Sequence, residues 1–326
     1  MRIKKLLALV LAVILILVTG CTAADNEQKP EYPTKVIDMS VLFGAGGGAD
    51  VVGRKLADLA SKELGQPIVA NNRVGGGGAV GYQYVLNAEP NGYSIVWNST
   101  SISTSYHAGN MPEGQDYSAF RGVAKVTDEA SALAVKADAR WETIEDFIAY
   151  AKANPEQVTV ANSGVGSFNH LNAVLIEQAT GVKFKHIPMD ATTSTTSLIG
   201  GRVDAIVNMA FDIIQQEQAG NVRALAVVAD TRQDSLPDVP TFKERGFDAD
   251  LTMYRGIAVP KETPDDVVKI LEDAFIKAGK SDEFKEFAGK YGVTVNVLGA
   301  KEFEALMKEQ DEQVAKAMDL IGMKKQ

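Results

Sequence analysis

The stretch Val36–Asp50, VIDMSVLFGAGGGAD, decides the fold of this chain. Its first half, VIDMSVLF, is apolar apart from one Asp and one Ser, which is typical of a buried strand. Glycines fill the middle of the stretch, and apolar residues return at helical spacing from Ala49 onward. A strand, a glycine turn and a helix start bring unobstructed backbone N–H groups to the positive end of a helix dipole. This geometry favours an anion, most simply a carboxylate or a phosphate.

The alternation of strand and helix continues beyond this stretch. The patterns over 33–100 predict βαβ units, whose strands would form a parallel sheet with its loops along one edge. Ligands of open α/β sheets bind at that edge. The candidate contacts in this first series are Ala45, Gly46, Gly47, Gly48, Ala49, Asp50, Gly76, Gly77, Asn98, Ser99 and Thr100.

A second alternating series runs from 143 to 228. A strand at 158–161 leads into the loop 162–167, and a helix is predicted from Phe168 to Thr180. The hydroxyl and N–H groups of this loop suit a second anionic group, whereas His170 could equally bond a local carbonyl. The candidate contacts in this series are Ser163, Gly164, Val165, Gly166, Ser167, Asn169, His170 and Asn208.

The N-terminus has the pattern of an export signal. Basic residues precede the apolar run Leu6–Val18, and small residues lead to Cys21. We predict a signal peptide over 1–20, lipid attachment at Cys21 and a polar tether over 21–32, so the protein would be extracytoplasmic and anchored to the cell membrane. The alternative is an ordinary signal peptide with an incidental Cys. Because Cys21 is the only Cys, an intramolecular disulfide is impossible.

Length and charge limit the classes of protein. About 290 residues follow the tether, which suggests two domains. We expect one lobe over 33–128 and 252–326 and a second over 129–251, facing each other across a cleft. The net charge of −9 and the lack of a basic run beyond the signal exclude nucleic acid as a partner.

Enzyme classes find little support in the sequence. Gly44-x-Gly46-x-x-Ala49 fits a dinucleotide fingerprint, but export argues against a nicotinamide cofactor. The three histidines lack metal-ligand spacing, and no Gly-x-Ser-x-Gly or paired carboxylates are found. We therefore expect no cofactor, no metal and no catalysis, and we expect Arg54 to be a solvated surface residue.

Short motifs across nearly all of the mature chain match one family. They are Gly46-Gly47-x-x-Asp50, Asn72-Arg73-x-Gly75-x-Gly77-Gly78, Pro90-Asn91-Gly92-Tyr93, Gly164-x-Gly166-Ser167-x-x-His170-Leu171, His186-Ile187-Pro188 and Leu236-Pro237-Asp238-Val239-Pro240. In this order and at these intervals, the chain resembles the extracytoplasmic receptors of tripartite tricarboxylate transporters, the Bug-type binding proteins.

The resemblance implies a two-lobed α/β periplasmic-binding-protein fold of type II. Each lobe would be a mostly parallel sheet flanked by helices, with hinge crossovers between the lobes. The loops Ala45–Asp50 and Ser163–His170 would grip a small carboxylate mainly through backbone amides. The receptor, a monomer, would then deliver its solute to membrane permease subunits. The same fold could also serve as a sensory module of a two-component system or, less simply, as an exported cleft enzyme.

Two departures from the family pattern bear on the ligand. Gly44 and Ala45 stand where the family usually has prolines, which predicts a more flexible loop. Met189-Asp190-Ala191 stands where Tyr-Lys-Gly is common, so Met189 and Asp190 join the candidate contacts. Asp190 would repel a second carboxylate or pair with an amine. Dicarboxylates, tricarboxylates, monocarboxylates and amino acids therefore all stay open.

Overall fold

The structure is a computed structural model that describes residues 32–189, 191–233 and 235–323. Lys35–Gln326 form one compact unit, separate from Met1–Thr34. The predicted signal peptide, Cys21 and Asp190 lie outside the described residues. No helix among the described residues is long and apolar enough to cross a membrane.

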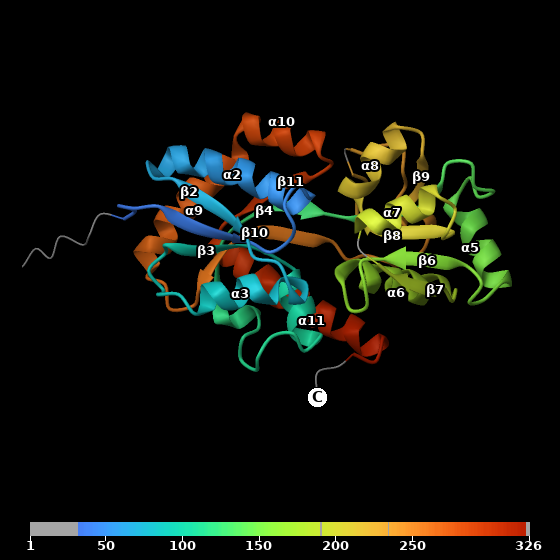
Figure 1. The fold of residues 1–326 in the computed structure, drawn as a ribbon, viewed down its shortest axis with the longest axis horizontal. Coiled ribbons are helices and arrows are strands. Elements are labelled where there is room, and N and C mark those ends of the chain that lie inside the picture. The colour runs from blue at the N-terminus through green and yellow to red at the C-terminus, as the bar shows by residue number, and fades with distance from the viewer. Residues whose placement is uncertain (1–31, 190, 234, 324–326) are drawn as a thin grey trace, which may run out of the picture. The chain divides into compact units, whose positions relative to one another are not determined.

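Sheet A has the strand order β11-β4-β10-β3-β1-β2. Its strands are β1 Ile37–Val41, β2 Ile68–Asn72, β3 Ser94–Ser99, β4 Phe120–Glu129, β10 Met253–Pro260 and β11 Thr294–Leu298 (Figure 1). Its helices are α2 Gly48–Leu64, α3 Ala79–Leu86, α4 Ser101–His107, α9 Asp265–Lys280, α10 Asp282–Lys290 and α11 Ala300–Leu320, with short 3₁₀ turns at Gly76–Gly78 and Tyr117–Ala119. We call these elements the sheet A half.

Sheet B has the strand order β7-β6-β8-β5-β9. Its strands are β5 Ser131–Lys136, β6 Thr159–Asn162, β7 Lys185–Pro188, β8 Ala205–Met209 and β9 Val222–Val228. Its helices are α5 Ile144–Ala153, α6 Phe168–Thr180, α7 Ala191–Ile199 and α8 Ala210–Gln218, and a 3₁₀ turn covers Lys243–Arg245. We call these elements the sheet B half.

The α/β fold class is confirmed, but both sheets are mixed and not mostly parallel. β1 pairs in parallel with β2 and β3, and β6 pairs in parallel with β7 and β8, as the βαβ patterns predict. The other pairings, β10 with β3 and β4, β11 with β4, and β5 with β8 and β9, are antiparallel. The antiparallel pairings arise where the chain crosses between the two sheets. β4 runs into β5 with only Ala130 between them, and β10 runs back into sheet A in the opposite direction.

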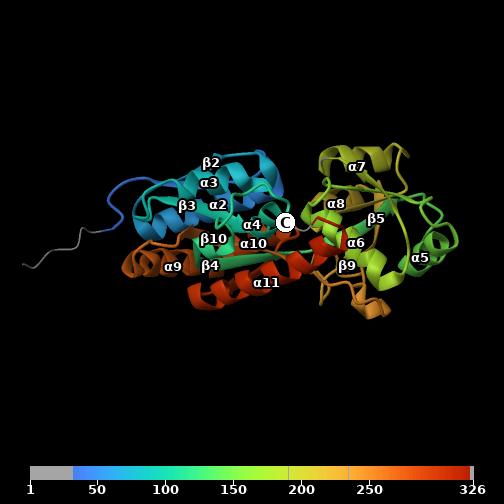
Figure 2. The same ribbon diagram turned by 90° about the horizontal axis from the view of Figure 1, so that it is seen from below.

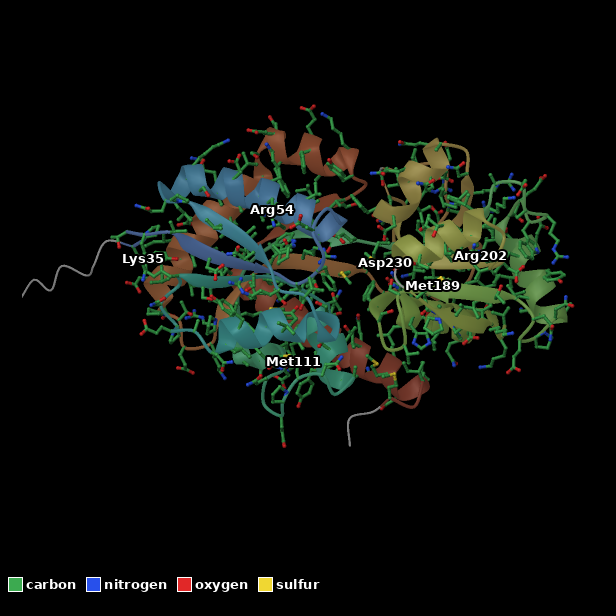
Figure 3. The ribbon with its side chains drawn as sticks, in the orientation of Figure 1. Lys35, Arg54, Met111, Met189, Arg202 and Asp230 are labelled. Atoms are coloured by element: carbon green, nitrogen blue, oxygen red, sulfur yellow. The ribbon has the colours of Figure 1, made fainter. Side chains whose placement is uncertain are left out.

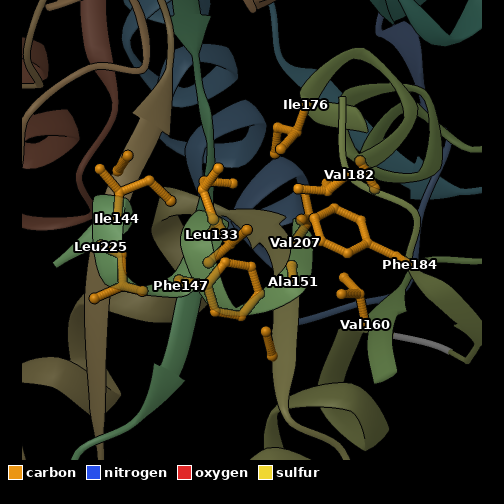
Figure 4. Packing of buried hydrophobic residues seen from close by; sticks show 14 of the residues in the cluster. Leu133, Ile144, Phe147, Ala151, Val160, Ile176, Val182, Phe184, Val207 and Leu225 are labelled. Atoms are coloured by element: carbon orange, nitrogen blue, oxygen red, sulfur yellow. The ribbon is translucent and has the colours of Figure 1, made fainter. Parts of the chain in front are cut away.

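The core of the sheet B half shows how the sequence pattern builds a layer (Figure 4). Leu133 and Val135 on β5 point to one cluster, whereas Ala132 and Ala134 point to another, as strand alternation requires. The α5 helix adds Ile144, Phe147, Ile148 and Ala151, which recur at helical spacing along one stripe. The Thr143 side chain accepts a hydrogen bond from Asp146 N–H and caps this helix.

Two elements were not predicted. The sequence over 101–120 has no clear helix or strand pattern, yet Ser101–His107 forms α4. Its buried side chains are largely hydroxyls, such as Ser101, Ser103 and Ser105, so no apolar periodicity marks it. The second is β11, which lies between α10 and α11 in the chain and forms one edge of sheet A.

Candidate functional site

The first glycine loop joins β1 to α2. Gly44–Gly47 are exposed, and Gly46 has a φ of +82°, a left-handed conformation that glycine adopts without strain. The helix begins at Gly48. As at every helix start, the N–H groups of its first turn have no intrahelical partner, and here no N-cap side chain bonds them either. The Trp97 Nε1–H donates to Ala49 O at 2.9 Å and fixes this turn against β3.

Asp50 holds the loop from inside. Its carboxylate is buried and accepts hydrogen bonds from Gly46 N–H (2.9 Å), Arg54 Nε (2.8 Å) and Asn72 Nδ2 (2.8 Å). Burial alone would raise the pKa of Asp50, but the hydrogen bonds from Gly46 and Asn72, together with the Arg54 charge, lower it. Asp50 is therefore an ionised acceptor that shapes the loop.

Arg54 is exposed at the surface, as expected, but its guanidinium also has fixed partners. Besides Asp50, its guanidinium donates to Ala70 O (2.9 Å) and to Asn72 Oδ1 (2.8 Å), so it ties α2 to β2 (Figure 3). Sequence spacing does not reveal these partners, because they lie on a neighbouring strand. Arg54 also neutralises the Asp50 charge beside a loop that we expect to bind anions.

The second glycine loop joins β6 to α6. Gly164 and Gly166 have φ values of +100° and +76°, and Val165 between them is 64% exposed. The Ser167 side chain caps α6 by accepting from His170 N–H at 3.2 Å. His170 Nδ1 accepts from Gly166 N–H at 3.0 Å, so this histidine bonds a local N–H and not a carbonyl.

The acceptor role of His170 requires a neutral imidazole. Burial lowers the pKa of His170 to about 4, and nearby His186 adds to the effect while Glu177 opposes it. The two rings meet edge to face with centroids 5.0 Å apart. At neutral pH the Nδ1 lone pair is consequently available to Gly166.

The two loops share one construction. In each, the third residue of the helix accepts a hydrogen bond from the residue before the N-cap: Asp50 from Gly46, and His170 from Gly166. This resembles a capping box displaced by one residue. This hydrogen bond orients the loop. The first helical amides still have no intrahelical partners, and such amides bind anions.

Further side chains support the second loop. Asn169 Nδ2 donates to Ser163 Oγ (2.7 Å), and Ser131 Oγ donates to Asn169 Oδ1 (2.7 Å). Asn172 Nδ2 also donates to Ser131 Oγ, at 2.9 Å. These bonds connect the loop to the first residue of β5, where the chain enters sheet B.

The other predicted contacts in the sheet A half differ in exposure. Gly76 and Gly77 are exposed in a left-handed turn, and Gly76 O accepts from Ser105 Oγ at 2.6 Å. Asn98, Ser99 and Thr100 are fully buried. Asn98 and Ser99 bond Tyr82, and Thr100 bonds Gln310. Their direct contact with a ligand stays a prediction, because their side chains serve the sheet A half here.

Met189 and Asn208 lie in the sheet B half. Met189, which Figure 3 labels, is partly exposed, and its N–H donates to Asn162 O, at the start of the second loop, at 3.0 Å. Asn208 is fully buried, and its Nδ2 donates to Ser194 Oγ at 2.7 Å. Met189 is therefore the better placed of the two to meet a ligand.

Each loop lies against the opposite half. A Cβ on Gly48 would come within 2.9 Å of the Phe211 ring on α8, and Phe211 stacks on Tyr291 with centroids 5.6 Å apart. A Cβ on Gly166 would come within 3.7 Å of Ala108, next to α4. The start of α6 also packs against the C-terminal part of α11 in a shared apolar cluster (Figure 2).

A charged cluster at the crossovers was not predicted as part of the site. Arg255 Nε on β10 donates to Glu129 Oε1 at the end of β4 at 2.7 Å, and both residues are buried. Asp212 on α8 lies close enough to interact electrostatically with both residues. An Arg inside the apolar run Tyr254–Val259 was the available signal. Among the described residues, no three His, Cys, Asp or Glu side chains are grouped to hold a metal ion.

Comparison with known proteins identifies the family. A sequence profile of the tripartite tricarboxylate transporter family receptor, TctC, matches residues 52–323. The chain belongs to this family. The resemblance found in the sequence is therefore confirmed, and the family is one of substrate-binding receptors.

Individual relatives agree along almost the whole chain. A Cupriavidus necator protein, described as the UPF0065 protein in the gbd 5′ region, is 28% identical, and the match covers 91% of each chain. A TctC solute-binding protein from Polaromonas is 32% identical with a TM-score of 0.75, over 88% of this chain and 99% of that one. The periplasmic binding protein BugD is 31% identical with a TM-score of 0.78, over 90% and 100%. The periplasmic-binding-protein fold is confirmed.

Proposed function

We propose that this receptor captures a small organic carboxylate between two lobes and delivers it to a membrane permease. The lobes are 33–128 with 252–326, and 129–251. The observation that carries the proposal is the shared construction of the two loops. Each presents first-turn amides of a helix, held open by an internal acceptor, and each is contributed by a different sheet.

Carboxylate binding fits the charge of the protein. The chain carries a net charge of −9, so an anion must be bound by local dipoles. Structures of the same fold, at 22% and 24% identity, are described as holding malate and adipate. They show that this fold can hold dicarboxylates, although they leave the ligand of this chain open.

The export pattern gives the location. We propose that the mature protein is a monomer anchored through lipid at Cys21, on the extracytoplasmic side, next to its permease. Labelling with a radioactive fatty acid should mark the wild type and not Cys21→Ser. Equal labelling of both would contradict the anchor.

The function is tested by calorimetric titration with mono-, di- and tricarboxylates. At least one should bind, and Ser167→Asp should weaken it at least 100-fold. Asp is a good N-cap, so α6 is retained while a negative charge enters the loop. Gly46→Asp should act in the same way on the first loop. Its matched control is Gly220→Asp, because Gly220 shares a positive φ and open surroundings but lies outside both loops. Unchanged affinity in both loop variants would contradict the proposal.

A further inference from the structure

The crossover cluster of Glu129, Arg255 and Asp212 lies between the two loops. Phe43 is the residue directly before the first loop, and Arg255 Cζ is 5.7 Å from the centre of its ring. Ser131, two residues after Glu129, bonds Asn169 beside the second loop. A ligand held by both loops would therefore face this cluster. The inference rests on the proposed function, because it assumes that the ligand is held there.

Arg255 has one unused donor group. Its side chain is only 6% exposed, and its Nε is engaged by Glu129. Its Nη1 is buried and has no hydrogen-bond partner among the described residues. A buried charged donor without an acceptor is costly, so this nitrogen favours an additional oxygen ligand.

Asp212 supplies an uncompensated negative charge. It is the third residue of α8, and the start of that helix is fixed at the crossover because Ala210 N–H donates to Ala130 O at 2.9 Å. Burial and the Glu129 charge raise the pKa of Asp212 to about 6, and Arg255 opposes them only partly. The Arg255 guanidinium pairs with Glu129, and no ion pair among the described residues joins Asp212 to a cation, so an ionised Asp212 leaves the cluster one positive charge short.

We propose that Arg255 and Asp212 recognise a carboxylate and an ammonium group of one ligand, so that the solute is a zwitterionic amino acid. Arg255 Nη1 binds a carboxylate oxygen, and Asp212 binds the ammonium. A ligand with carboxylates alone would bring its charge towards Glu129 and Asp212 without compensation, and would bind more weakly. This recognition uses side chains and adds to the amide grip of the loops.

The test compares ligands that differ by one amine. Full-length protein is titrated at pH 7.5 with the pairs succinate and aspartate, glutarate and glutamate, and propionate and alanine. In the pair that binds best, we expect the amine-bearing member to bind at least tenfold more tightly. Asp212→Asn should remove this preference by weakening the amine-bearing member. Asp146→Asn is the matched control, because Asp146 is also the third residue of a helix in the same half but is exposed.

A proton measurement on the wild type covers the case in which Asp212→Asn fails to fold. Glu129 on β4 and Arg255 on β10 are the charged groups that act on Asp212. An ammonium beside Asp212 lowers its pKa, so binding at pH 6 should release about half a proton per ligand. Titrations in buffers of different ionisation heat measure this release.

The outcomes separate the two proposals. Tighter binding of succinate, glutarate or propionate than of its amine-bearing partner would overturn the inference while supporting carboxylate capture. Retained preference in Asp212→Asn, or no proton release with the amine-bearing ligand, would also overturn it. Binding of none of the six compounds would overturn the inference, and failure of the whole carboxylate panel would overturn the proposed function as well.

Discussion

Asp50 and His170 occupy equivalent positions but carry different charges. Asp50 is an ionised acceptor, and its charge is neutralised by Arg54 at 2.8 Å. His170 is a neutral acceptor because burial disfavours its charged form. In both loops the internal acceptor therefore adds no uncompensated negative charge next to amides that we expect to bind an anion.

The pH dependence of stability should reveal the neutral His170. Its pKa falls from 6.5 to about 4 on folding, so its contribution to stability is present above pH 6.5 and is lost as the pH falls towards 4. The loss should be on the order of 3 kcal/mol. His170→Asn keeps an acceptor for Gly166 but does not titrate. Urea unfolding between pH 7 and pH 4 should show a smaller decline for this variant, and equal declines would contradict the assignment.

Sequence alone located the loop residues but not their partners. Gly46, Gly166 and Ser167 stand out because strand, glycines and helix follow one another within a short segment. Arg255 and Asp212 are far apart in the sequence and come near each other only through the fold, so no local pattern connects them. Local contacts can be predicted from a single sequence, whereas contacts between distant elements need the topology.

At the scale of elements, the start of α2 is shaped for the approach of α8. Gly48 leaves room for the Phe211 ring, which also stacks on Tyr291. Any side chain at position 48 would enter space that the ring occupies, because a Cβ there lies 2.9 Å from Phe211 Cγ. The glycine is therefore required by helix packing as well as by the open amides.

A double-mutant cycle tests this contact. Gly48→Ala should destabilise the protein by about 1–3 kcal/mol, because overpacking outweighs the better helix propensity of Ala. In the Phe211→Ala background, the same substitution should cost little or be stabilising by up to about 1 kcal/mol. Urea unfolding of the four proteins measures the coupling, and additive effects would show that the two residues do not restrict each other.

The predictability of whole elements follows their hydrophobic pattern. β1 with α2, and β6 with α6, were predicted because each combines an apolar strand, a glycine loop and a capped or glycine-started helix. α4 escaped prediction because buried hydroxyl side chains, such as those of Ser101, Ser103 and Ser105, replace its apolar stripe. β11 is an edge strand of only partly buried residues, so its sequence lacks the signal of a central strand.

For the whole molecule, we expect the connections between the two sheets to permit closure. β4 continues into β5 through Ala130 alone, and β10 re-enters sheet A after the segment 229–252. The C-terminal part of α11, with Val314 and Met318, packs against Phe168 and Leu171 of α6. We expect these crossovers to act as the hinge of a motion in which the glycine loops approach or separate.

Fluorescence energy transfer between the halves tests this motion. In a Cys21→Ser background, Lys62→Cys on α2 and Lys152→Cys on α5 place dyes on exposed positions of the two halves. The carboxylate identified by calorimetry should raise the mean transfer efficiency and narrow its distribution, because ligand contacts from both loops favour the closed population. The pair Lys62→Cys and Lys277→Cys lies within the sheet A half and should not respond. If saturating ligand leaves the first pair unchanged, binding occurs without closure, and the two loops do not act on one ligand together.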